Sequence, residues 1–93
     1  MTTNEAVDSV AGSEVATRIS AYVETKAKAA VAHDTDLVEA GILTSMVAME
    51  MVVFLESAFD ISIIGRDLKL DNFRTLDNMA ALVTRLRETA ADA

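Results

Sequence analysis

The segment SMVAMEMVVFLESAF, residues 45–59, constrains the fold more than any other part of the chain. It is apolar almost all round at helical spacing, and only two glutamates and two serines interrupt it. We therefore expect a helix that begins near Ser45 and ends near Ala58, with Thr44 or Ser45 as its N-cap. A chain of 93 residues cannot bury such a helix on every side, so an apolar face is left for partners.

Two further helices are predicted around this one. Ser13 is a suitable N-cap for a first helix over about 13–31, and Thr75 caps a last helix that has Asp77 in its first turn. Apolar residues recur at helical spacing in both helices: Val15, Ile19, Tyr22, Val23, Ala27 and Ala30 in the first, and Leu76, Met79, Ala80, Val83 and Leu86 in the last. A short helix is expected over Arg66–Asp71, and FDISII before it is expected to be an ordered connector, since no partner strand exists for it.

The connection HDTDLVEAGILT between the first two long helices is not a plain solvated loop. Its four large apolar residues are expected to hold it against the helices, while Gly41 permits a backbone turn that other residues resist. These apolar residues are Leu37, Val38, Ile42 and Leu43. With no proline and three glycines, the sequence predicts an all-α fold: a small four-helix bundle of three longer helices and one short one. Residues 1–12 are expected to be a mobile tail, 13–88 the folded domain and 89–93 a C-terminal tail.

Composition excludes several classes of function. The absence of cysteine and the single histidine, His33, argue against disulfides and metal sites, and we expect no bound metal. The net charge of −7 argues against binding to nucleic acid or to an anionic membrane surface. The N-terminal segment lacks the pattern of a secretory signal, and no apolar run reaches the ~18 residues of a membrane span. A monomer in the cytoplasm is expected.

Ser45 is the residue that the pattern singles out for chemistry. A hydroxyl at a helix start lies beside unpaired backbone amides, where a phosphodiester on its oxygen would be stabilised. Position alone describes any N-cap serine, but the surrounding residues resemble the acyl and peptidyl carrier protein family. That family has an acidic and apolar loop, a glycine, Asp-Ser-Leu, an apolar helix and Leu-Glu-x-x-Phe. Here the corresponding residues are Gly41-Ile42-Leu43-Thr44-Ser45-Met46 and Leu55-Glu56-Ser57-Ala58-Phe59, with Asn72-Phe73-Arg74-Thr75 near the end.

The resemblance covers residues 13–87 and implies a carrier that is not itself an enzyme. It implies that Ser45 carries 4′-phosphopantetheine, attached from coenzyme A by a phosphopantetheinyl transferase, and that acyl-loading and acyl-processing enzymes are the other partners. The sulfur needed for thioester chemistry would then belong to the cofactor. Two positions depart from the family: Thr44 replaces Asp, and Met46 replaces Leu. The loss of a negative charge at Thr44 implies either a narrower choice of transferase or a carrier that is never modified.

Partner docking is expected around Ser45. Residues 29–65 contain six acidic residues and no lysine or arginine, which favours steering of basic partners. The candidate docking residues are Thr44, Met46, Val47, Met49, Glu50, Val53, Glu39 and Asp36. For Met49 and Val53 a core position is an equal alternative, whereas Val47 is expected to be exposed. An apolar docking face suggests polyketide or other secondary metabolism, and GILTSMVAMEM resembles discrete carriers for unusual extender units.

Three alternatives remain at this stage. The chain could be a peptidyl or aminoacyl carrier of nonribosomal peptide synthesis. It could also be a helical adaptor that buries its apolar helix in a partner. A small hydrolase with Ser45 as nucleophile is disfavoured because no base is evident. His33 is expected to be solvated near the end of the first helix.

Overall fold

The computed structural model describes residues 3–92, and the side chains of residues 14–88. These residues form three α-helices, α1 (Thr3–Ala27), α2 (Ser45–Phe59) and α3 (Leu76–Asp92), and two 3₁₀ helices, η1 (Gly65–Asp67) and η2 (Leu70–Phe73). No strand occurs within residues 3–92, so the predicted all-α class is confirmed and FDISII is an irregular connector.

The predicted single short helix over residues 66–71, and with it a four-helix bundle, is not confirmed. In place of one short helix over 66–71, the chain forms η1 and η2, separated by Lys69 in extended conformation (φ −116°, ψ 143°). This break lets η2 turn Phe73 into the core, where it is 4% exposed. Burial of one aromatic ring therefore outweighs the local preference for a continuous helix.

Helix α1 also differs from the prediction. It begins at Thr3 rather than Ser13, and it ends at Ala27 rather than near residue 31. Lys28 ends it by adopting left-handed backbone angles (φ 59°), and the Glu24 carboxylate accepts a hydrogen bond of 3.1 Å from the Val31 amide just beyond. The predicted mobility of residues 1–12 stays a prediction, and residues 1 and 2 lie outside those described. Helix α3 continues to Asp92, through most of the segment expected to be a tail.

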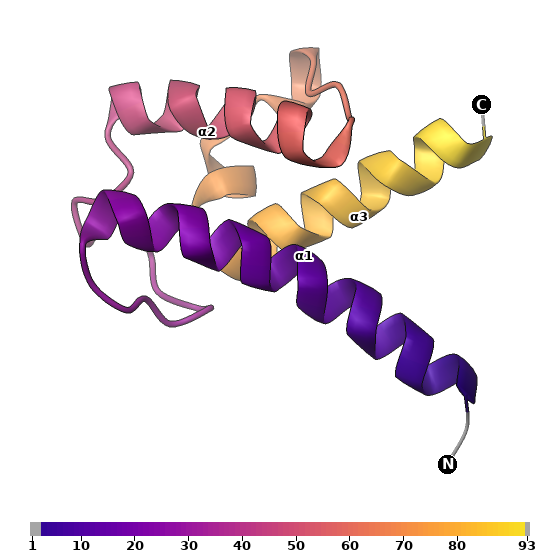
Figure 1. The fold of residues 1–93 in the computed structure, drawn as a ribbon. Helices are drawn as coiled ribbons and strands as arrows, with labels where there is room; N and C mark the ends of the chain where they lie inside the picture. The colour runs from indigo at the N-terminus through magenta and orange to yellow at the C-terminus, as the bar shows by residue number, and fades with distance from the viewer. Residues whose placement is uncertain (1–2, 93) are drawn as a thin grey trace.

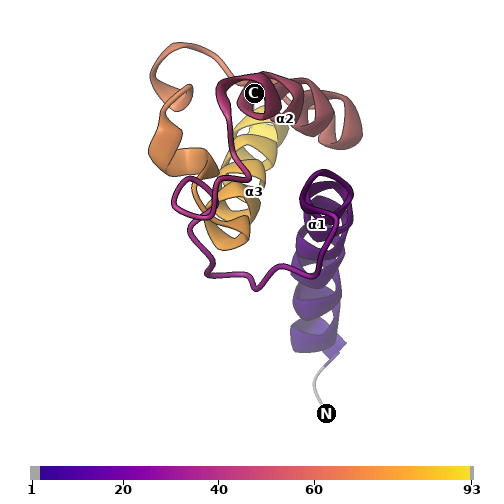
Figure 2. The same ribbon diagram turned by 90° about the vertical axis from the view of Figure 1, so that its left-hand side faces the viewer.

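The three helices pack around one apolar core. Figure 1 shows α2 lying above the later part of α1, with α3 beside them. Figure 2 shows the long loop leaving the end of α1 and passing below the start of α3 before it rises to α2. Of the predicted stripes, α1 buries Val15, Ile19 and Val23 and α3 buries Leu76, Met79 and Val83, and Leu37 and Leu43 of the loop join them. The other predicted positions are half-buried, except Ala30, which is exposed beyond the end of α1. The core consists of Val15, Ile19, Val23, Leu37, Leu43, Met51, Leu55, Phe59, Ile61, Ile63, Phe73, Leu76, Met79, Leu82 and Val83. None of the described helices is both long and apolar enough to cross a membrane.

Candidate functional site

Ser45 is the first residue of α2, and its side chain is exposed to solvent. The preceding residue, Thr44, is the N-cap: its hydroxyl accepts a 3.2 Å hydrogen bond from the Val47 amide and its carbonyl accepts a 2.8 Å bond from the Ala48 amide. Within the described residues, nothing accepts a hydrogen bond from the amides of Ser45 and Met46. The start of α2 thus offers an exposed hydroxyl beside two free N–H groups.

This arrangement fits a phosphodiester on the Ser45 oxygen. The positive end of the helix dipole and the free amides both favour a negative group there. The first turn of α2 contains no acidic residue that would oppose it. Any tether attached at this hydroxyl would project into solvent rather than into the protein.

The loop before Ser45 is fixed by Leu37. Its side chain is fully buried, its amide donates a 2.7 Å hydrogen bond to the Arg74 carbonyl, and its own carbonyl accepts 2.9 Å bonds from Ile42 and Leu43. Gly41 supplies the tight turn between them with φ +76°. The prediction that apolar residues hold this loop against the helices is confirmed, and the loop delivers Ser45 to a defined place.

Asp36, predicted as a docking residue, holds the same loop together. One carboxylate oxygen accepts hydrogen bonds from the amides of Val38 (3.0 Å) and Glu39 (3.1 Å), and the other lies 3.0 Å from Nε of Arg74. The Glu39 amide and the Arg74 guanidinium hold the pKa of the Asp36 carboxyl below its usual value. Asp36 therefore joins the loop to the start of α3 as well as lying near the site.

The other predicted docking residues mostly share the outer face of α2. Met46 and Met49 are each 71% exposed and Val53 is 63% exposed, so these three side chains face solvent rather than the core. Val47 is half-buried against the core, contrary to the expectation that it is exposed. Glu50 is exposed and forms an ion pair of 2.8 Å with Lys26. Thr44, next to Ser45, and Glu39, in the preceding loop, are also exposed.

Sequence reasoning missed Leu68 and Leu70. They are 53% and 48% exposed and line a shallow apolar groove with Met49, Val52 and Phe73. The sequence did contain a signal for these two residues. Leu68 and Leu70 flank Lys69, and a single short helix over 66–71 would have had to bury both leucines or leave them exposed to solvent. The apolar surface near Ser45 is therefore wider than α2 alone.

The geometry gives no support for a catalytic triad. Among the described residues, no side chain forms a hydrogen bond with the Ser45 hydroxyl. His33 is exposed, as predicted, and its Nδ1 lies 3.6 Å from an Asp77 oxygen. The described part of the chain also holds no cluster of three or more side chains suited to a metal ion.

Comparisons with known proteins agree with this site. The family model described as "Phosphopantetheine attachment site" matches residues 17–83, a range that includes the loop, Ser45 and α2. The chain is 41% identical over 54 residues to a D-alanyl carrier protein of Streptococcus thermophilus, covering 58% of this chain and 68% of the relative. It is 40% identical over 55 residues to that of Lactococcus lactis, covering 59% and 70%. No solved structure matches the chain significantly.

Proposed function

Because this chain belongs to the family of proteins with a phosphopantetheine attachment site, whose cofactor is covalent 4′-phosphopantetheine, we propose that Ser45 carries this arm. When bound, the arm supplies the thiol on which an acyl or aminoacyl group is held as a thioester. The chain itself catalyses nothing. It presents the group to successive enzymes at high local concentration.

The observation that carries this proposal is the exposed Ser45 hydroxyl beside the free amides of Ser45 and Met46. A nucleophilic serine would need a base within hydrogen-bond reach, and none of the described residues supplies one. A phosphodiester needs only access and a favourable field, and both are present. A purely structural adaptor is disfavoured by the match to the family with a phosphopantetheine attachment site, since an exposed serine at a helix start is common in any protein.

Carriers of this kind interact with a phosphopantetheinyl transferase and with enzymes that load and unload the arm. The outer face of α2 supports docking of such partners, because Met46 and Met49 are exposed within one helical turn of Ser45. Thr44 stands where the family has Asp. It keeps the N-cap hydrogen bond but removes a negative charge beside the attachment point, which favours a transferase that does not require that charge.

The cargo is proposed to be an aminoacyl group. The relatives described above are named D-alanyl carrier proteins, which favours an amino acid over the polyketide intermediate expected from the sequence. The polyketide setting rested on the apolar face of α2, which is compatible with either cargo, and on the resemblance of GILTSMVAMEM to discrete carriers for extender units, which the relatives named above do not share by name. Isolation of the chain from its source at mildly acidic pH, followed by mass spectrometry of the arm, would distinguish the two cargoes. A ketoacyl or malonyl group in place of an amino acid would refute this part of the proposal.

Attachment itself is tested with coenzyme A and a broad-specificity transferase. The intact mass of the wild-type chain should rise by one phosphopantetheine, and Ser45→Ala should remain unmodified. Ser57→Ala is the matched control, since Ser57 is another exposed serine on α2 and its loss should leave the reaction unchanged. An unmodified wild type, with several transferases, would sink the proposal.

A further inference from the structure

Charge is divided unevenly along this acidic chain. Residues 29–65 carry six acidic residues and no lysine or arginine, whereas residues 66–87 carry five basic residues and three acidic ones. Residues 66–87 therefore carry a net charge of +2 in a protein whose total charge is −7. Because the sign of the charge is reversed in this segment, the surroundings of its basic side chains indicate what kind of partner it could bind.

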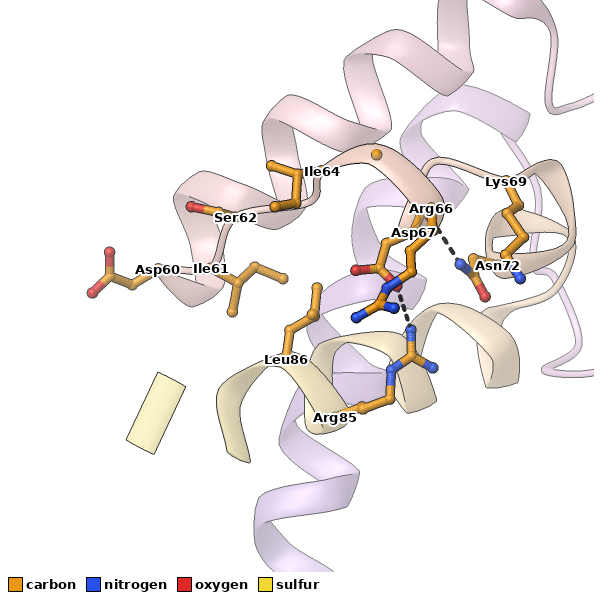
Figure 3. Close-up of a pocket in the computed structure, with 11 residues that line it drawn as sticks. Asp60, Ile61, Ser62, Ile64, Arg66, Asp67, Lys69, Asn72, Arg85 and Leu86 are labelled. Carbon is orange, nitrogen blue, oxygen red and sulfur yellow. Dashed lines mark hydrogen bonds and ion pairs between the residues drawn. The ribbon is translucent and has the colours of Figure 1, made fainter. Parts of the chain in front are cut away.

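Three of these basic residues line one open hollow. Arg66 and Lys69 come from the connector and Arg85 from α3, with Ile64 and Leu86 among the apolar lining residues. Figure 3 shows the side chains of Arg66, Asp67 and Arg85 gathered between the connector and α3. The hollow adjoins the end of α2 at Asp60 and extends along the connector to Lys69, which also lines the groove beside Met49.

The basic side chains that line the hollow differ in their hydrogen bonds and ion pairs. Arg85 lies 3.0 Å from an Asp67 carboxylate oxygen, and the Asp67 carbonyl accepts a 2.8 Å hydrogen bond from the side-chain amide Nδ2 of Asn72, so Asp67 is held in place between them. In contrast, the side chains of Arg66 and Lys69 form no hydrogen bond or ion pair with any of the described residues. Two exposed cations therefore stay unneutralised in a molecule with an excess of carboxylates.

An apolar residue lines the same hollow as these two cations. Ile64 is 68% exposed, immediately before Gly65, whose φ of +46° turns the chain so that η1 begins. A single exposed isoleucine needs no explanation, but one at the rim of a basic hollow pairs an apolar contact with positive charge. A ligand that satisfies both must be acidic and carry an apolar side chain.

We infer that this hollow, defined by Ile64, Arg66, Lys69 and Arg85, binds an acidic protein segment with an apolar side chain. A membrane or nucleic acid is disfavoured because each presents an extended array of negative charge to a chain of net charge −7, whereas a short segment can place its few carboxylates on the three bases of the hollow alone. A small free anion is disfavoured because the bases lie on an open rim and no buried polar group converges on one point. The segment would contact the connector between α2 and α3, whose hollow does not include Ser45, so the attachment point would stay free for other enzymes. This inference does not depend on the proposed modification, since the hollow is the same without it.

The test uses a synthetic peptide of alternating glutamate and leucine, added to the isotope-labelled full-length chain. Amide resonances should shift in a saturable way at residues 60–69 and 85–86. Arg66→Gln and Lys69→Gln should each weaken binding by about two- to fivefold, the range for one exposed ion pair. The control is Lys28→Gln, because Lys28 is also exposed and its side chain has no partner in the described part, yet it lies at the end of α1. It should leave the affinity unchanged.

Several results would overturn the inference. Equal weakening by Lys28→Gln would mean attraction to net charge rather than to this hollow. Shifts confined to Met46, Met49 and Val53 would place the peptide on the outer face of α2. The same shifts with inorganic phosphate alone would make the hollow a small-anion site, and no saturable shift would leave no site at all. Circular dichroism of each variant verifies that the fold is kept.

Discussion

Shortening Leu37 to alanine tests whether the loop before Ser45 belongs to the core. The Leu37 side chain is 0% exposed, so the substitution removes three fully buried carbons. At ~0.8 kcal/mol for each, the lost transfer free energy is about 2.4 kcal/mol, and the cavity left behind raises the cost toward ~5 kcal/mol. A chain of 93 residues is stable by only about 5–14 kcal/mol, so this is a large fraction of the total.

Urea denaturation followed by far-UV circular dichroism measures this free energy, and the thermal midpoint should fall by at least about 10 °C. Val38→Ala is the matched control on the same loop. Val38 is half-buried, so about half of its ~1.6 kcal/mol transfer free energy should be lost. If Leu37→Ala costs no more than Val38→Ala with an unchanged denaturant slope, the loop is not packed as described, and the positioning of Ser45 needs another cause.

Three further predictions concern single contacts around the loop and the connector. Thr44→Ala removes the N-cap bond from the Val47 amide and should cost about 1 kcal/mol in urea denaturation, whereas Thr44→Asp, which keeps an acceptor, should not. Hydrogen bonds lower the pKa of the Asp36 carboxyl in the folded chain. Their contribution to the free energy of unfolding is complete above the unfolded pKa of ~3.9, and it is lost as the pH falls through the lower pKa of the folded state. The stability difference between wild type and Asp36→Asn, measured in urea at stepwise lower pH, should therefore shrink in acid. Gly65→Ala should cost roughly 1–2 kcal/mol through its left-handed φ of +46° alone, since nothing lies within 4 Å of the added carbon; Gly65→Asn should cost less by the same assay.

The sequence was sufficient for the parts of the fold that local patterns determine. The continuous apolar segment and the Thr44–Ser45 pair predicted α2 and its N-cap, and the structure has both. Leu37 and Leu43 predicted that the loop packs on the core, because exposing large apolar side chains to water is unfavourable. Both side chains are buried in the structure. Thr75 was predicted as the cap of α3, and its hydroxyl accepts a 3.0 Å bond from the Asn78 amide.

The sequence could not reveal features that depend on distant contacts. Residues after Lys28 favour helix, yet the chain leaves α1 there so that the following loop can reach α3. Asp60 ends α2 in the left-handed conformation with φ 54°, which a non-glycine residue adopts rarely and which no periodicity signals. The partner of Asp36 is Arg74, 38 positions away. No local sequence pattern connects the two residues, so the sequence alone could not show that the Asp36 carboxylate is paired.

That pairing changes how the acidic surface near Ser45 should act. Asp36 lies 3.0 Å from Arg74 and Glu50 lies 2.8 Å from Lys26, and beyond a Debye length of ~8 Å each pair is nearly neutral to an approaching protein. Glu39 retains an unpaired carboxylate in the described part of the chain, so the local field is weaker than a count of acidic residues implies. The net charge of −7 still favours encounter with basic partners, but the surface they meet at Ser45 is Met46 and Met49. Recognition there should therefore depend on apolar burial and shape, with charge acting mainly on the rate of encounter.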